Sequence, residues 1–304
     1  MREFIHKNSA IGKRITEFGL ACMASPPYLS RNKQLIFLCG ANRAPDLPSY
    51  RREAIKRYIQ NISENNSVIY AESVLNELIK IGHQKNALDL EHDISDLADK
   101  IIIVLESEST FCELGAFAHP KLREKLIVIN NSKFKGSESF INTGPIAAMR
   151  EVKSPVLWYP MSDSIRSTVD GIGATFAELK QALIPPSRKT SPLAREEISQ
   201  LKIDRASLYF VHDLVFFAGP ITNGELVDFL KTAFGEKSYD PLSRLLGILR
   251  AGGLINSNLI SDNKWIYRTV SKLPFLDYKT NTSSLMSTCR HFHLKNNPER
   301  FSLV

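Results

Sequence analysis

IIIVLESESTFCELGAF, residues 101–117, contains the clearest strand-to-helix pattern of this chain. Its first five residues, Ile101 to Leu105, are apolar and mostly β-branched, which predicts a buried parallel strand. A polar break at 106–110 leads into a helix-like run, so Glu113 follows the carboxyl end of the strand and lies at the mouth of a helix. In an open α/β sheet, ligands bind at that edge, because strand ends and helix N-termini converge there.

Similar strand patterns recur on both sides of this stretch. Buried-strand patterns are followed by helical ones, and the last strand is followed by a predicted long closing helix over 164–183. This alternation predicts an α/β fold with a doubly wound parallel sheet covered on both faces. The other predicted strands span residues 34–40, 67–71, 125–130 and 154–158, and the intervening helices include 74–81 and 87–98.

A second carboxylate, Glu72, directly follows the predicted strand SVIYA. Two carboxylates in one pocket without metal ligands suit chemistry at a glycosidic carbon, where a carboxylate stabilises or attacks the positive charge that develops on the sugar. Glu113 is the stronger candidate for nucleophile, since a carboxylate at a helix start stays ionised, and Glu72 or Ser109 would position the ribose. The competing interpretation is that Glu113 only complements the helix macrodipole.

The loop after the first predicted strand, ANRAPDLPSY, lacks the GxGxxG pattern of dinucleotide-binding proteins. Arg43, Arg51 and Arg52 lie near this edge and are candidates for phosphate contacts, although solvated helix charges are the favoured interpretation. After the fourth strand comes a long polar segment. Its FINTGP motif, residues 140–145, is a candidate lid over the site.

The proline-rich segment 184–196 predicts a domain boundary near residue 191, so the expected parts are a basic arm (1–33), the α/β domain (34–190) and a smaller α+β domain (191–304). In the last part, predicted helices at 197–217, 220–234 and 241–251 precede a β-hairpin around 261–263. This order is typical of a winged helix. In a winged helix, Arg244, Arg250 and Lys264 would contact nucleic acid. The alternative is that this domain serves only for protein docking or dimerisation.

Composition narrows the class of protein. The 304 residues carry a formal charge of +7, with 11 basic against 4 acidic residues in the first 60, which suggests an acidic partner such as nucleic acid. No run resembles a membrane span, and the N-terminus lacks the apolar stretch of a signal peptide, so a cytoplasmic protein is expected. The four cysteines show no CxxC spacing and predict neither a zinc site nor disulfides; Cys39 and Cys112 are interpreted as buried structural residues.

These motifs carry a resemblance. SESTFCELGAF after DKIIIVL resembles the signature of nucleoside 2-deoxyribosyltransferase-like proteins, in which the Glu of Glu-Leu-Gly is the nucleophile. Together with IFLCG, LREKLIVI and KFKGSESFINTGP, it is similar to the effector protein of type II retrons, which joins such a domain to a C-terminal winged helix. The resemblance covers nearly the whole chain.

The resemblance implies an antiphage toxin that hydrolyses the N-glycosidic bond of NAD or a related nucleotide, with no further cofactor. It implies control by the retron reverse transcriptase and its multicopy single-stranded DNA (msDNA), and assembly as a homo-oligomer or larger complex. Glu113 would be the nucleophile, and Gly40, Ser109 and Asn142 would line the pocket; Glu72 lies in a context that matches the family less closely. The alternative is a nucleotide-sensing DNA-binding regulator without catalysis.

Overall fold

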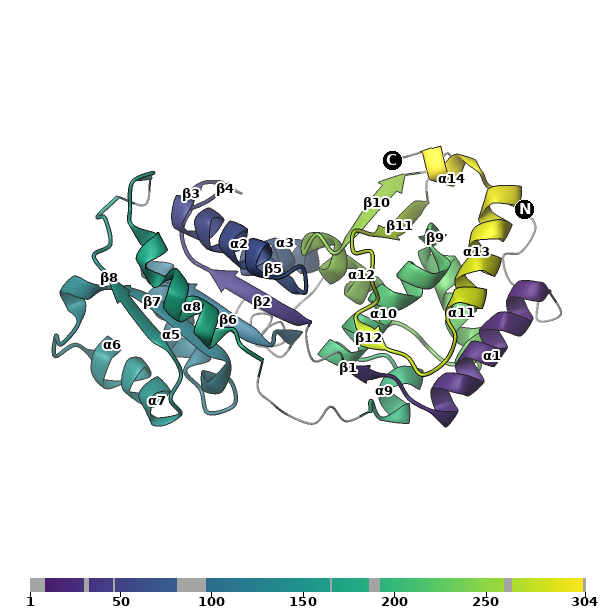
Figure 1. Ribbon diagram of the computed structural model, residues 1–304, viewed down its shortest axis with the longest axis horizontal. Helices are drawn as coiled ribbons and strands as arrows, with labels where there is room; N and C mark the ends of the chain where they lie inside the picture. The colour runs from purple at the N-terminus through teal and green to yellow at the C-terminus, as the bar shows by residue number, and fades with distance from the viewer. Residues whose placement is uncertain are drawn as a thin grey trace. The chain divides into compact units, whose positions relative to one another are not determined.

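The computed structural model describes residues 9–29, 33–45, 47–80, 97–164, 166–185, 192–259 and 264–302. The chain forms two compact units (Figure 1). Asn32–Ser187 make up the α/β unit, and Met1–Arg31 together with Arg188–Val304 make up the helical unit.

The α/β unit is built on one five-stranded sheet whose neighbouring strands are all parallel. Taken in chain order, the strands lie in the sequence 2-1-3-4-5, so the order reverses between the first and the third. In a doubly wound sheet, the carboxyl ends of the strands at such a reversal border the ligand crevice. From one edge to the other the strands are β5 (Asn66–Tyr70), β2 (Gln34–Cys39), β6 (Lys100–Val104), β7 (Leu126–Asn131) and β8 (Val156–Tyr159).

Helices cover both faces of this sheet because its central strands are apolar on both sides. Alternate residues of the strands, such as Ile36 and Leu38, join one buried cluster with residues of α2 (Tyr50–Ile62) and α8 (Phe176–Ala182) (Figure 1). The intervening residues face the other way, where α3 (Ala71–Lys80) contacts β2 and β5, and α5 (Glu108–Phe117) contacts β6. The remaining elements are β3 (Asn42–Ala44), β4 (Leu47–Pro48), α6 (Phe140–Thr143), α7 (Pro145–Glu151) and the 3₁₀ turns Arg123–Lys125, Ser132–Phe134 and Ile172–Thr175.

The five strands confirm the predicted parallel α/β sheet, with ends that differ by only one or two residues. The long closing helix predicted over 164–183 is wrong, because α8 begins only at Phe176. Asp170 is held by side chains of α2 and β8, and Gly171 has a left-handed φ of 76°, so the preceding residues cannot continue a helix. The helix predicted over 87–98 lies almost entirely outside the described residues.

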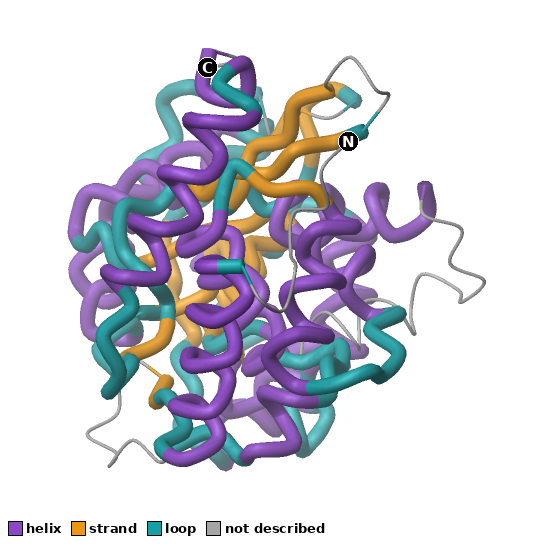
Figure 2. The backbone as a smooth tube through the Cα atoms, turned by 90° about the vertical axis from the view of Figure 1, so that its right-hand side faces the viewer, coloured by secondary structure: helices purple, strands orange, loops and turns teal. Residues whose placement is uncertain are grey.

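The helical unit combines seven helices of the described chain with two small sheets. Strands β10, β11 and β9 form a three-stranded antiparallel sheet in that order, and β1 pairs with β12. Figure 2, in which this unit faces the viewer, shows helices packed around these strands. In chain order the elements are α1 (Ala10–Ala24), β1 (Tyr28–Leu29), α9 (Arg195–Ser199), α10 (Arg205–Ala218), β9 (Ile221–Thr222), α11 (Asn223–Phe234), α12 (Pro241–Ala251), β10 (Ile255–Leu259), β11 (Trp265–Thr269), β12 (Leu276–Asp277), α13 (Ser283–Asn296) and α14 (Glu299–Ser302).

The N-terminal arm packs on the helices of the distant C-terminal segment. Helix α1 contacts α11 and α13, and its apolar stripe of Ile11, Ile15, Phe18 and Cys22 is buried. The Phe18 ring meets the rings of Phe217 and Phe229 edge-on. The N-terminal arm, for which the sequence leaves packing on the chain and docking on a partner open, therefore packs on its own chain.

Two predicted features of the helical unit need correction. The single helix expected over 197–217 is two helices, because the Asp204 side chain accepts from the Ser207 amide and caps a new start at Arg205. The tail after Lys279, whose sequence shows no clear periodicity, contains α13, whose buried residues are only Leu285, Cys289 and His293. Such a narrow stripe gives a weak sequence signal.

Candidate active site

The candidate active site lies where the strand order reverses, at the carboxyl ends of β2 and β6. Gly40 and Ala41 follow β2, and Leu105 and Glu106 follow β6. The backbone amide of Ala41 donates to Oε1 of Glu106 over 3.0 Å, which ties the two strand ends together. The Glu106 carboxylate therefore holds the carboxyl ends of β2 and β6 together at this edge of the sheet.

Glu106 is the centre of a buried ion network. Its side chain is fully buried, and its Oε1 also accepts from the Ser49 hydroxyl at 2.6 Å. The Arg51 guanidinium, 2% exposed, donates to Oε2 at 2.9 Å. A buried carboxylate with this many donors is held in one position, since each lost partner would leave charge uncompensated in the interior.

Arg51 extends the network to the segment that follows β8. Its second terminal nitrogen donates to Asp170 at 2.7 Å and to the backbone carbonyl of Ser162 at 2.5 Å, and the Tyr159 hydroxyl also donates to Asp170. Burial alone would raise the pKa of Asp170, but the hydrogen bonds from Arg51 and Tyr159 outweigh it and lower that pKa. The pKa of Tyr159 is raised by burial and by its bond to Asp170.

Arg52 forms a second buried cluster at the same edge. It donates to Glu72 at 2.7 Å and to the carbonyl oxygens of Leu38 and Gly40, which brings two predicted site residues together. A Cβ at Gly40 would lie 2.5 Å from Cδ of Arg52 and 2.8 Å from Oε1 of Glu106. Gly40 therefore lets both clusters close around the strand end.

The environment of the arginines differs from the interpretation favoured by the sequence, in which they are solvated helix charges. Arg51 and Arg52 are buried and bind carboxylates, so that interpretation is wrong for both. Arg43 is partly exposed; it pairs with Glu53 at 2.8 Å and lies over the Tyr50 ring.

Glu113 lies in the second turn of α5, which begins five residues earlier at Glu108. Thr110 fixes this start: its hydroxyl donates to the Ser107 carbonyl at 2.6 Å and accepts from the amides of Glu106 and Ser107. The helix dipole acts mainly in the first turn, so the macrodipole role suits Glu108 better than Glu113. Glu113 is half-buried with Oε2 shielded from solvent, whereas Ser109 is exposed and its hydroxyl is 3.0 Å from that of Ser107.

The FINTGP segment is helical rather than a loop: α6 ends at Thr143, and Gly144 leads into α7. Asn142 uses its amide nitrogen to hold the preceding turn, donating to the carbonyls of Phe134 and Ser137 at 2.9 and 2.8 Å. Its Oδ1 is buried and accepts no hydrogen bond from the described residues. Phe140, at the start of α6, is 79% exposed.

The remaining candidates at this edge are the cysteines. Cys39, at the end of β2, is buried as expected, but Cys112 is exposed, so its interpretation as a buried residue is wrong. Cys112 lies on the solvent side of α5 while Leu114, two residues later, faces the core. Within the described ranges, no group of three or more His, Cys, Asp or Glu side chains is placed to hold a metal ion, and no helix is long and apolar enough to cross a bilayer.

The predicted nucleic-acid residues lie on α12 and the β10–β11 hairpin of the helical unit. Arg244 is exposed, and Arg250 is half-buried with its guanidinium 5.6 Å from the centre of the Trp265 ring. Six residues apart on a helix, the two arginines point about 120° away from each other. Lys264 is exposed beside Trp265. The fold thus brings Arg250 to the hairpin but directs Arg244 elsewhere.

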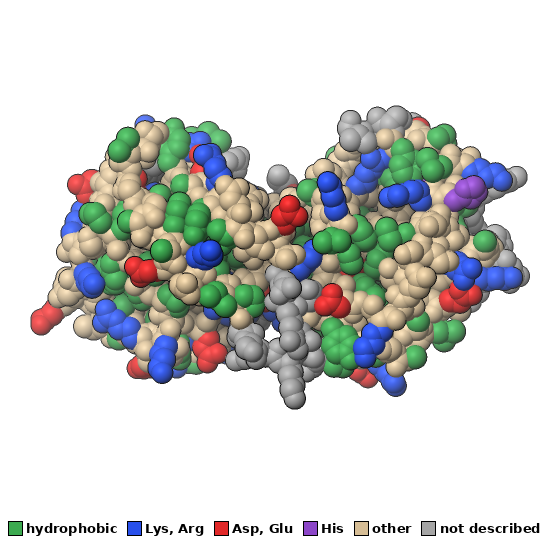
Figure 3. Space-filling model, in the orientation of Figure 1, with side chains coloured by type: hydrophobic (Ala, Val, Ile, Leu, Met, Phe, Trp, Pro, Cys, Tyr) green, Lys and Arg blue, Asp and Glu red, His purple; other side chains and the backbone are tan. Residues whose placement is uncertain are grey.

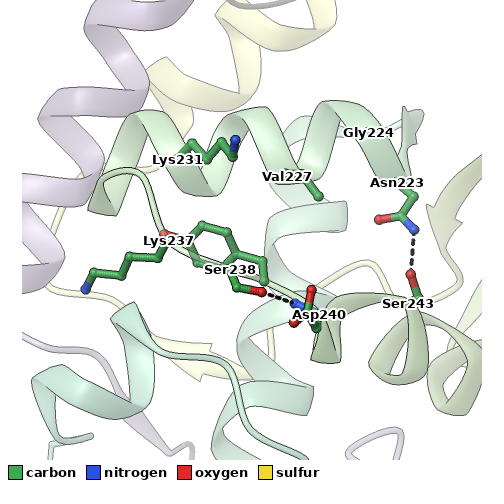
Figure 4. Close-up of a pocket in the computed structure, with 9 residues that line it drawn as sticks. Asn223, Gly224, Val227, Lys231, Lys237, Ser238, Asp240 and Ser243 are labelled. Carbon is green, nitrogen blue, oxygen red and sulfur yellow. Dashed lines mark hydrogen bonds between the residues drawn. The ribbon is translucent and has the colours of Figure 1, made fainter.

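A cavity of about 580 Å³ lies beside α11 and the start of α12 (Figure 4). Asn223 donates to the Ser243 hydroxyl across it at 2.8 Å, and Lys237 points away from Asp240. Lys231 pairs with Glu236 at 3.0 Å. Because the charges around this cavity are mixed, it favours no class of ligand.

Sequence reasoning missed Glu106, Asp170 and Tyr159. Glu106 could have been predicted, because it is the first polar residue after an apolar strand. Glu72 has the same position relative to its own strand. Asp170 and Tyr159 had none, because their relation to Arg51 spans more than 100 residues of chain.

Comparison with known proteins identifies relatives over most of the chain. A model of the family described as STM3845 retron effector protein matches residues 48–257. An Escherichia coli protein named "Retron Ec73 putative ribosyltransferase/DNA-binding protein" is 39% identical over 280 residues, which cover 88% of this chain and 87% of that protein. The Escherichia coli "Retron Ec86 putative ribosyltransferase/DNA-binding protein" is 34% identical over 139 residues, covering 45% and 44%.

Proposed function

Because this chain belongs to the STM3845 retron effector family, we propose that it is an antiphage effector that cleaves the N-glycosidic bond of NAD or a related nucleotide, with Glu113 as the nucleophile. The observation that carries this proposal is the position of Glu113. It is half-buried in the helix that follows β6, at the strand reversal of the sheet, and beyond the helix turn where a macrodipole role would place it. The relatives' names, which include ribosyltransferase, support the same class of chemistry.

The proposed reaction has two displacement steps. A carboxylate oxygen of Glu113 attacks C1′ of the ribose, and the C1′–N bond breaks with its electron pair leaving on the base; nicotinamide departs neutral because its ring nitrogen was cationic. Water then attacks C1′ of the glycosyl ester, which releases the sugar phosphate (ADP-ribose where NAD is the substrate) with a new hydroxyl at C1′, frees a proton and restores the carboxylate. No cofactor is consumed.

The proposed pocket residues have different duties in this scheme. Asn142 offers its buried Oδ1 as an acceptor for a ribose hydroxyl, since its amide nitrogen is already occupied. Ser109 presents an exposed hydroxyl one turn before Glu113. Gly40 shapes the wall, and Glu72 acts through its ion pair with Arg52.

For the helical unit we propose a winged helix built from α10, β9, α11, α12, β10 and β11, which contacts retron nucleic acid or the reverse transcriptase. The order of these elements, with three helices and an antiparallel hairpin, supports this assignment. Binding of the reverse transcriptase and msDNA would hold the toxin inactive in the cytoplasm, in a homo-oligomer or larger assembly.

The test compares cells that express the wild-type chain with cells that express Glu113→Gln, a nearly isosteric change. We expect NAD loss and growth arrest with the wild type and neither with the variant, because an amide oxygen is a poor nucleophile. Glu108→Gln, on the same helix but in its first turn, is the matched control and should remain toxic. NAD loss that persists in Glu113→Gln would refute the assignment.

The second candidate is a nucleotide-sensing DNA-binding regulator without catalysis, which the words "DNA-binding" in the relatives' names favour. It predicts sequence-specific duplex binding that weakens in Arg244→Gln and Arg250→Gln and falls steeply with salt. A chain that turns over no nucleotide but protects a defined duplex from cleavage would support this candidate instead.

A further inference from the structure

A second cavity of the helical unit, distinct from the surface of Arg244 and Lys264, has the character of an anion site. It encloses about 450 Å³, within the range of roughly 300–1,000 Å³ that is usual for small-molecule sites. Its wall combines the end of α10, the segment after β11, the middle of α13 and α14. Twelve residues line it: Val215, Phe216, Gly219, Pro220, Arg268, Thr269, Val270, Ser271, Lys272, Met286, Arg290 and Phe301.

The charge of this lining is entirely positive. Arg268, Lys272 and Arg290 contribute three cations, and no Asp or Glu belongs to the wall. No ion pair within the described part of the chain joins any of the three to a carboxylate. Figure 3 shows Lys and Arg side chains gathered over the end of this unit that carries α13 and α14.

Arg268 is the most constrained of the three cations. It donates to the backbone carbonyl of Arg300 and lies 5.5 Å from the centre of the Phe301 ring. Its Nε is shielded from solvent and makes no hydrogen bond to the described residues. Burial lowers the pKa of this guanidinium. A half-buried cation without a counter-charge gains most from an incoming anion, which would offset its desolvation.

The rest of the lining selects the kind of anion. Phe216 and Phe301 offer half-buried rings and Met286 a half-buried thioether, so the cavity has an apolar wall beside its cations. Thr269 and Ser271 add hydroxyl groups. Three cations are more than a single carboxylate needs, but they suit the several charges of phosphate groups. A ligand that joins phosphates to an aromatic base would use both the cations and the aromatic wall, because bases stack on aromatic side chains.

We propose that this cavity binds a nucleoside phosphate, with the phosphates on Arg268, Lys272 and Arg290 and the base against Phe216 and Phe301. The site goes beyond the glycosidase proposed for the α/β unit. The bound nucleoside phosphate is either a free nucleotide or one unit of a nucleic-acid strand. Arg268 also lines a neighbouring cavity of about 370 Å³ that contains Arg250 and likewise no carboxylate, so a strand can continue across it.

The test measures binding by fluorescence anisotropy to the full-length chain, with fluorescein-labelled oligo(dT) as the strand probe and ATP as the competing free nucleotide. The cavity variant is Lys272→Gln/Arg290→Gln, in which both changed residues are exposed, so neither change disturbs the buried core. We expect it to weaken probe binding at least roughly tenfold. The slope of log K against log salt should become shallower by about 1.4, or about 0.7 for each lost phosphate contact.

The control is Lys202→Gln/Lys295→Gln, which removes the same charge from exposed positions of the same unit outside the cavity. It should bind as the wild type does. Competition by ATP would identify a free nucleotide as sufficient, and its absence would identify a strand. The proposal is overturned by equal losses in both double variants, by no loss in the cavity variant, or by failure of both probes to bind. None of these outcomes depends on whether Glu113→Gln abolishes NAD cleavage.

Discussion

At the scale of single residues, the buried pair of Arg51 and Glu106 organises the candidate active site. Glu106 joins the ends of β2 and β6, and Arg51 joins Glu106 to Asp170 beyond β8. The ion pairs of Arg51 with Glu106 and Asp170 would therefore fix the spacing of the strand ends that carry substrate-binding residues. Seven residues separate Glu106 from Glu113, and the Thr110 contacts between them carry that order into α5.

Removal of the Arg51 charge tests this account. Arg51→Met leaves Glu106 buried without its cation and should lower the free energy of unfolding by about 3–5 kcal/mol. Arg43→Met is the matched control, because Arg43 and its partner Glu53 are partly exposed and the loss of their ion pair should cost much less. Urea denaturation of both variants provides the comparison. Equal midpoint shifts would contradict a special role for the buried pair.

At the scale of elements, the last two helices are clamped to the start of α11. Arg300 donates to both oxygens of Glu225, at 2.8 and 2.9 Å, and Glu225 also accepts from the amide of Thr222. The neighbouring His293 is completely buried, with Nε2 3.0 Å from the Ala218 carbonyl. These contacts join α13 and α14 to the strand and helix that precede the hairpin.

This clamp predicts a pH dependence of stability. Burial, followed by the charge of Arg300, lowers the pKa of His293 to about 4 from 6.5. Between these values the unfolded chain binds more protons than the folded one, so stability rises as pH rises from about 4 to 6.5 and is complete above that window. The contribution is on the order of 3 kcal/mol.

Chemical denaturation at pH 5 and pH 7 checks this prediction. The free energy of unfolding should fall on acidification in the wild type, and the difference should shrink in His293→Gln. His291→Gln, an exposed position on the same helix, is the control and should keep the wild-type difference. An unchanged pH dependence in His293→Gln would assign the effect to other groups.

At the scale of the whole molecule, the chain consists of one continuous and one discontinuous unit. Residues 32–187 contain a complete sheet and its buried cluster. The other unit needs both ends of the chain, because α1 covers α11 and α13 with four buried apolar side chains. The N-terminal arm is thus part of the unit that carries the hairpin.

Fragments test this division. A fragment of residues 32–187 should fold cooperatively by circular dichroism, whereas a fragment of residues 188–304 should be unstable because α11 and α13 lose their cover. Adding residues 1–31 as a separate peptide should restore helical signal to the second fragment. A stable 188–304 fragment that ignores the peptide would show that α1 is dispensable.

Local sequence patterns predict the parallel sheet, the position of Glu113 after its third strand, and the bounds of α12. Those features depend on local patterns: five short, mostly apolar runs, and Pro241 at the first position of a helix. The same local signals predict Thr222 or Asn223 as the N-cap of α11, and the Glu225 amide, which donates to the Thr222 hydroxyl, identifies Thr222 as the cap.

Which charged side chains are buried depends on tertiary contacts that no local pattern predicts. Arg51, Arg52 and Glu106 look like solvated polar residues in the sequence, yet they pair with partners 20 to 119 residues away. The partner of α1 is likewise distant in the sequence, because this N-terminal helix packs on α11. Periodicity reports which face of an element is buried, but only the folded chain supplies the particular partner that makes a buried charge stable.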